Sequence, residues 1–308
     1  MGRRRGGTPI HGWLIIDKPR GLTSNAVVGR VRRMTDAAKV GHGGTLDPLA
    51  TGILPLALGE ATKTVSYAMD GKKVYVFTVR WGEQTESDDS EGAVTETSDV
   101  RPTEQDIREN LKFFTGEIEQ VPPVFSAIKV DGRRAYDLAR NKEPVELAPR
   151  KVQIETIALL DRPDKDHAVF EVACGKGTYV RSIARDLARK LGTFGHVSAL
   201  RRTRVGPFGE DRAISLDKLD GLGHSAPLAD LLLPVETVLD DIPALALTEE
   251  EARRLRHGQG VSALHVVSRS PLENISQGVV VCAMAEGKPV ALARIEGGEI
   301  RPLRVFNM

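Results

Sequence analysis

The chain has 308 residues, of which 41% are apolar and 28% charged, a composition that supports a core of ordinary size and argues against wholesale disorder. No apolar stretch approaches the roughly 18 residues that a membrane span needs, and the N-terminus lacks the apolar run of a secretory signal. The two cysteines, Cys174 and Cys282, are too few for a disulfide framework, so the sequence predicts a cytoplasmic protein.

A formal net charge of +1 hides a strong segregation of charge along the chain. Residues 1–40 hold nine Lys and Arg against two acids, and residues 171–210 hold eight against three. Residues 83–120 hold twelve acids against three bases, and residues 216–251 hold nine against one. If the fold gathers the two basic blocks, they will form an anion-binding surface.

In chain order, hydrophobic periodicity and turn residues predict a mixed α/β pattern. The first half is expected to contain a strand at 12–17, a helix from Thr23 or Ser24 to Met34, a helical segment at 61–69, a strand at 73–81, a loop or hairpin at 83–99 and a helix at 103–114. The second half is expected to contain paired strands at 150–160 and 167–174, a helix at 178–191 and a strand at 195–206. The helix at 178–191 is the clearest of these, because its apolar residues form one stripe.

A domain boundary is expected near residue 240, after the second acidic block. Thr248 and Glu251 fit a capping box for a helix that ends before Gly258. Three strands at 278–284, 289–295 and 300–306 complete a compact C-terminal module. We therefore expect a disordered basic tail at 1–10, a main domain at 11–240 and a small module at 241–308.

The densest chemical feature is the segment from His42 to Gly52, which holds three glycines, a proline and one acid. Asp47 stands directly before Pro48, which favours an extended backbone and lets the carboxylate project from a rigid loop. A plain Asp-Pro turn would give the same pattern. A phosphate-binding P-loop fits poorly, because no lysine follows Gly44 and the segment Gly175 to Thr178 is only a fragment of that motif. Zinc-site spacing, a Gly-x-Ser-x-Gly elbow and a dinucleotide-binding glycine fingerprint are absent from the sequence.

The segment HGGTLDPLATGILPLALGEATK (42–63) resembles the catalytic motif of the tRNA pseudouridine-55 synthases. The opening GWLIIDKPRGLTS (12–24) also resembles that family, and three further motifs follow in the family's order: VPPVFSAIKVDGRRAYDLAR, GKGTYVRSIARDLARKLG and HVSALRR. The resemblance covers residues 12–220. One departure is Gly43, where the family commonly has threonine.

The resemblance implies an α+β fold with a mixed or antiparallel central sheet flanked by helices, and a C-terminal module similar to the PUA RNA-binding domain. It implies that the protein isomerises uridine 55 in the T-loop of tRNA to pseudouridine, without a cofactor or metal. Asp47 would be the nucleophile, with Arg181 as its ion-pair partner and Tyr75 stacking on the target base. Further substrate contacts would come from His42, Tyr179, Leu200, Lys18 and Pro19. RNA-backbone contacts would come from Lys63, Lys129, Arg140, Arg201 and Arg202, with residues 122–149 forming an insertion that grips RNA.

Several alternatives stay open at this point. A non-catalytic RNA-binding or tRNA-folding protein could use the same cleft, and a glycosidase-like hydrolase would lack its usual second carboxylate. Asp47 could attack C1′ of the ribose, attack C6 of the base or abstract a ribose proton, and either Tyr75 or water could accept the C5 proton. We expect tRNA as the partner, no membrane association, and a monomer without an obligate protein partner.

Overall fold

A ten-stranded sheet forms the centre of the molecule. The computed structural model describes residues 6–130, 132–141, 143–221, 228–270 and 276–308. The strand order is β14-β1-β3-β12-β4-β11-β10-β7, and β2 and β13 pair with β3 and β12. The strands are β1 (Gly12–Lys18), β2 (Val40–His42), β3 (Thr51–Leu58), β4 (Lys73–Trp81), β7 (Gly116–Gln120), β10 (Arg150–Asp161), β11 (His167–Cys174), β12 (Gly195–Val205), β13 (Phe208–Gly209) and β14 (Ile214–Ser215). Only β1 with β14 and β3 with β12 pair in parallel among these described strands, so the predicted mixed, mainly antiparallel sheet of an α+β fold is confirmed.

The described α-helices are α1 (Ser24–Thr35), α2 (Val65–Asp70), α3 (Glu104–Leu111), α4 (Ala135–Arg140), α5 (Val180–Lys190), α6 (Leu216–Gly221), α7 (Glu249–Arg256) and α8 (Ala263–Val267). Side-chain caps mark the start of α1, α3 and α7 among them. Thr23, not Ser24, caps α1 by accepting the amide of Ala26 at 3.1 Å. The capping box predicted for Thr248 and Glu251 is present on α7. None of the helices in the described ranges is long and apolar enough to cross a membrane.

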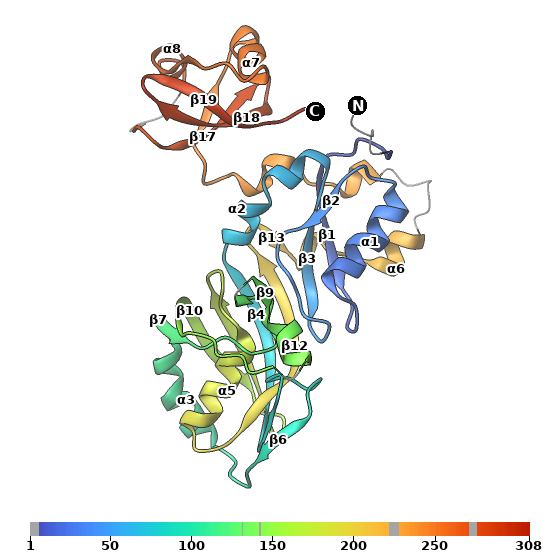
Figure 1. Cartoon of the computed structure of the whole chain (residues 1–308), viewed down its shortest axis with the longest axis vertical. Helices are drawn as coiled ribbons and strands as arrows, with labels where there is room; N and C mark the ends of the chain where they lie inside the picture. Colours follow the sequence, from blue (N-terminus) through green and yellow to red (C-terminus); the bar gives the residue numbers. More distant parts are fainter. Residues whose placement is uncertain (1–5, 131, 142, 222–227, 271–275) are drawn as a thin grey trace.

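The alternating side chains of β1 divide the interior into two layers. Leu14 and Ile16 join the main core, to which α1, α3 and α5 contribute their apolar faces. Trp13 and Ile15 point to the opposite side, where Phe208 packs against Trp13 with a ring-centroid distance of 5.2 Å. Figure 1 shows α1 beside β1 and β3, and α3 and α5 beside the far half of the sheet.

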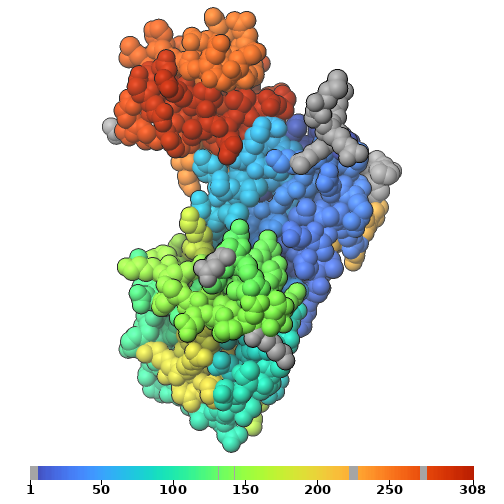
Figure 2. Space-filling model, viewed as in Figure 1, coloured from blue at the N-terminus to red at the C-terminus, as the bar shows by residue number. Residues whose placement is uncertain are grey.

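The C-terminal module is a five-stranded sheet with two helices, and it packs on the second of these layers. Its order is β15 (Ala244–Ala246), β17 (Val280–Ala285), β18 (Lys288–Glu296), β19 (Glu299–Val305) and β16 (Val261–Ser262). Leu292 and Phe306 are buried in the same cluster as Trp13. Lys63 donates to the carbonyl of Val305 at 2.7 Å. In Figure 2 this lobe rests on the light-blue segment that contains Lys63.

Three expectations differ from the structure. The strands β2, β3 and β7 were not predicted. For β3 the reason is that it contains Pro55 and is buried on both faces, which removes the alternation that marks a strand. The loop expected around Asp47 is shorter than the segment from His42 to Gly52: it runs from Gly43 to Ala50, because β2 ends at His42 and β3 begins at Thr51. The disordered tail at 1–10 is wrong at Thr8, whose amide donates to Asp36 O at 2.6 Å; residues 1–5 lie outside the described residues.

Candidate active site

A cavity of about 690 Å³ lies where the segment Gly44 to Asp47 meets the middle of the sheet and the start of α5. Its lining includes five of the residues predicted to act on the substrate, namely Asp47, Tyr75, Tyr179, Arg181 and Leu200. These residues are far apart in the sequence. The β3–β12–β4–β11 pairings bring them together, since β12 carries Leu200 and β4 carries Tyr75.

A short turn presents Asp47 to the cavity. Ala50 donates its amide to the carbonyl of Asp47 at 3.0 Å, closing a turn with Pro48 in its second position. Leu46 is fixed on the other side, because its amide donates to the hydroxyl of Ser24 at 2.8 Å. The carboxylate of Asp47 therefore projects from a loop that is held at both ends.

Arg202 supports the loop that carries Asp47 through hydrogen bonds to backbone carbonyls. Its guanidinium donates to the carbonyls of Ile53 at 2.8 Å, Gly44 at 3.0 Å and Thr45 at 3.4 Å, and the residue is 1% exposed. Gly52 makes this approach possible, because its φ is +95° and a Cβ there would lie 2.2 Å from the Arg202 carbonyl oxygen. These donors bind carbonyls of this chain and Arg202 also lines the cavity, so its predicted contact with RNA phosphates stays a prediction.

Lys18 is buried in the same way and anchors the neighbouring turn. Its ammonium donates to the carbonyls of Leu22 at 2.7 Å, Pro19 at 3.0 Å and Pro48 at 3.3 Å. The residue has no exposed surface in this structure, so nothing here supports the prediction that Lys18 binds substrate. Pro19 is exposed and is not among the described residues that line the cavity. Lys18 instead ties the turn after β1 to the turn that carries Asp47.

The burial of Lys18 makes stability depend on pH. Burial lowers the pKa of Lys18 from 10.5 to about 8, with Asp47 opposing the shift. The unfolded chain therefore binds more protons at this position between these two pH values, so the burial penalty is relieved as pH rises. We expect the free energy of unfolding of the wild type, relative to Lys18→Met, to increase between about pH 8 and about pH 10 in urea titrations. A difference that stays constant with pH would contradict this assignment.

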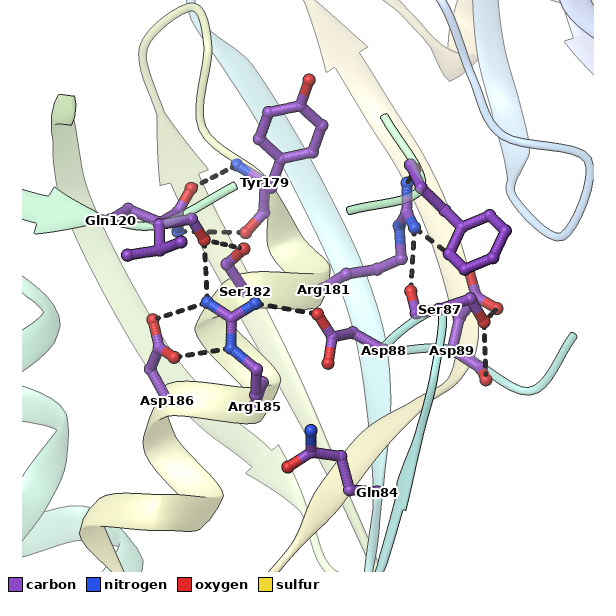
Figure 3. A network of polar contacts seen from close by, with 12 residues as sticks. Gln84, Ser87, Asp88, Asp89, Gln120, Tyr179, Arg181, Ser182, Arg185 and Asp186 are labelled. Atoms are coloured by element: carbon purple, nitrogen blue, oxygen red, sulfur yellow. Dashed lines mark hydrogen bonds and ion pairs between the residues drawn. The ribbon is translucent and has the colours of Figure 1, made fainter. Parts of the chain in front are cut away.

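Arg181 organises the acidic side of the cavity. Its guanidinium lies 2.8 Å from Asp47 Oδ2 and 3.5 Å from Asp89 Oδ2, and it donates to the carbonyls of Ser87 and Phe125, each at 2.9 Å. Figure 3 shows this guanidinium between the loop that carries Ser87 and Asp89 and the start of α5. The Arg181 side chain is 5% exposed and that of Asp47 37%, so one part of the carboxylate is paired while the rest remains accessible.

The aromatic residues of the cavity are held by the sheet and by a side-chain amide. Burial raises the pKa of Tyr75, with the nearby Arg202 opposing, so its phenol stays neutral near pH 7. Gln120, at the end of β7, pairs with both backbone groups of Tyr179 (2.8 and 3.1 Å), and the guanidinium of Arg150 lies 5.0 Å from the Tyr179 ring centre. His42 ends β2 and is not among the described lining residues; burial lowers its pKa, which keeps the ring neutral.

The remaining predicted RNA contacts differ in how accessible they are. Lys129 and Arg140 are exposed on the segment after Pro122, which also forms β8 (Lys129–Val130), β9 (Arg133–Arg134) and α4. Lys63 is paired with Glu60 and bound to the C-terminal module. Arg201 is half-buried and is paired with carboxylates of this chain, those of Asp17 and Glu210.

Sequence reasoning missed Asp89 and Gln120. Asp89 lies in the acidic segment that was assigned only as a loop or hairpin, and it follows β5 (Glu83–Thr85) before β6 (Val94–Thr97). The signal available was two adjacent acids between short strands, facing an arginine about a hundred residues away, which only the fold can bring together. Across the described residues, no group of three or more His, Cys, Asp or Glu side chains is placed to hold a metal ion.

The chain matches known families and relatives along most of its length. Residues 32–180 match the family described as TruB family pseudouridylate synthase (N terminal domain), and residues 181–240 match the tRNA pseudouridylate synthase B C-terminal domain. The chain is 61% identical to tRNA pseudouridine synthase B of Rhodospirillum rubrum over the whole of both chains, and 53% identical to that of Caulobacter vibrioides over the same extent.

Solved structures show the same fold. A chain in the crystal structure of a Cbf5-Nop10-Gar1 complex matches with a TM-score of 0.69 and 26% identity, over 97% of this chain and 84% of that one. A chain in the structure of an H/ACA RNP bound to a substrate RNA matches with a TM-score of 0.72 and 24% identity, over 100% and 92%. The full-length identities above, together with the two family matches, show that this chain belongs to the TruB family of pseudouridylate synthases.

Proposed function

We propose that this protein isomerises uridine to pseudouridine in the T-loop of tRNA, at position 55, with Asp47 as the nucleophile. The observation that carries this proposal is the accessible carboxylate of Asp47, paired with the buried Arg181 inside a cavity large enough for a nucleoside. In the net reaction the N1–C1′ bond breaks and a C5–C1′ bond forms. The proton on C5 is lost and N1 gains a proton, so no oxidant or group donor is consumed.

Each lining residue has a role that follows from its position. Arg181 aims the carboxylate of Asp47 through their 2.8 Å ion pair. Tyr75 offers an aromatic face to the uracil, and stacking of this kind is worth about 1–3 kcal/mol. Tyr179 and Leu200 complete the walls of the cavity.

The target base must leave its stack to reach Asp47, which costs a few kcal/mol that cavity contacts offset. The exposed cations Lys129 and Arg140 support an RNA-gripping role for the segment 122–149, which covers one face of the main domain in green in Figure 2. We also propose that residues 241–308 form a PUA-like RNA-binding module. A monomer acting on tRNA in the cytoplasm is the state in which we expect this chain to work.

The test is a mapping of pseudouridine in an unmodified tRNA transcript. After incubation with the protein, carbodiimide labelling and primer extension should report one new pseudouridine, at the T-loop uridine, and a transcript with cytidine at that position should give none. Binding without product would favour the non-catalytic RNA-binding alternative. Release of free uracil would indicate a hydrolase, and product at other uridines would refute the assigned position.

A further inference from the structure

Helix α5 carries a second buried arginine one turn after Arg181. Arg185 is 8% exposed, and each edge of its guanidinium has a partner. It lies 2.8 Å from Asp88 Oδ2 and 2.8 Å from Asp186 Oδ1, and it donates to the carbonyl of Val121 at 2.7 Å. Arg185 does not belong to the described lining of the cavity, so the proposed chemistry leaves this buried cation without a role.

The first partner of Arg185 is Asp88, which lies in the acidic loop, residues 85–92. This loop also contacts Arg181. Within three consecutive residues, Ser87 and Asp89 face Arg181 while Asp88 faces Arg185 (Figure 3). Asp88 has a φ of +59°, a conformation that non-glycine residues adopt only where the surroundings impose it. Its side chain is 7% exposed, so the ion pair with Arg185 is what allows the carboxylate to be buried there.

The second partner lies in the proline loop, residues 121–126, on the other side of the same helix end. The carbonyl of Val121 accepts hydrogen bonds from Arg185 at 2.7 Å and from Ser182 at 2.8 Å. Four residues later, the carbonyl of Phe125 accepts from Arg181 at 2.9 Å. Each of the two loops therefore contacts both arginines of α5.

We propose that Arg185, paired with Asp88, is a positioning residue for the isomerisation. By tying the acidic loop and the proline loop to α5, it fixes the carbonyl and carboxylate groups that aim Arg181 at Asp47. Arg185 acts through Arg181 and does not contact the substrate. This inference rests on the proposed function, because it assigns Arg185 to the rate of that reaction and not to RNA binding.

The first test separates the rate from binding. Arg185→Lys keeps a cation beside Asp88, but a single ammonium cannot also reach Val121, so we expect the single-turnover rate of pseudouridine formation to fall about 10- to 100-fold. The dissociation constant for tRNA should not change. Asp88→Asn, which leaves the guanidinium in place, should lower the rate in the same direction and provides a second route if Arg185→Lys does not fold. The matched control is Arg189→Met on the next turn of α5, because Arg189 is exposed and its one side-chain hydrogen bond among the described residues is to Gln84 Oε1, at 3.2 Å.

The second test asks whether Arg185 acts through Arg181. If it does, Arg181→Lys combined with Arg185→Lys should be no slower than Arg181→Lys alone, whereas independent roles would multiply the two losses. Multiplied losses, an unchanged rate in a folded Arg185 or Asp88 variant, or a loss explained by weaker tRNA binding would each overturn the inference. An inactive wild type would refute the proposed function itself, so the two failures are distinguishable.

Discussion

Asp47→Asn should abolish pseudouridine formation, lowering the single-turnover rate about a thousandfold or more, while tRNA binding is retained. Asparagine has nearly the same shape and can still accept a hydrogen bond from Arg181, so the loop that presents residue 47 should keep its conformation. The carboxylate, however, is lost, and an amide is a poor nucleophile. The rate is measured by tritium release from C5-labelled tRNA, and the binding by filter retention.

Asp70→Asn is the matched control for this experiment. Asp70 lines the same cavity and is also paired with a cation, Lys176, at 2.8 Å, but both of these side chains are exposed and Asp70 has no ion pair with Arg181 among the described residues. Its rate should equal that of the wild type. Equal losses in the Asp70 and Asp47 variants would mean that the cavity tolerates no loss of charge, and full activity of Asp47→Asn would remove Asp47 from the chemistry.

The elements that the sequence predicts well are those with a strong period. The strand at 73–81 is rich in β-branched and aromatic residues and becomes β4, and the single apolar stripe at 178–191 becomes α5. β3 was missed because a strand buried on both faces has no alternation and Pro55 argues against it. Periodicity indicates which surface a segment buries, but not that a proline-containing run can lie at the centre of a sheet.

The site could be predicted only where family resemblance identified single residues. Asp47, Tyr75 and Arg181 do line one cavity, but the pairing of Asp88 with Arg185 joins positions that are 97 residues apart and have no local pattern. Such a contact becomes visible only once the fold has placed the acidic loop against α5.

Lys18 and Arg202 have a structural part that the sequence did not indicate. Lysine and arginine are rarely fully buried, so no local pattern predicts that these two are. Here both are buried and donate to backbone carbonyls of the turns around Asp47. The backbone carbonyls of a tight, glycine-rich loop need hydrogen-bond donors, and in this fold the buried side chains of Lys18 and Arg202 supply some of them.

Arg202→Met tests whether Arg202 supports the loop that carries Asp47 or binds a phosphate of the RNA. Losing the donors to Gly44, Thr45 and Ile53 should lower the free energy of unfolding by about 2–4 kcal/mol and the rate by about 10- to 100-fold, since the loop that carries Asp47 loses its support. The slope of the logarithm of the tRNA binding constant against the logarithm of the salt concentration should not change. Lys129→Gln should do the reverse, reducing the slope by about 0.7–0.9 with an unchanged rate at saturating tRNA. If Arg202→Met reduced the salt slope as Lys129→Gln does, the guanidinium of Arg202 would have to reach a phosphate in the wild type. That result would refute its role in supporting the loop.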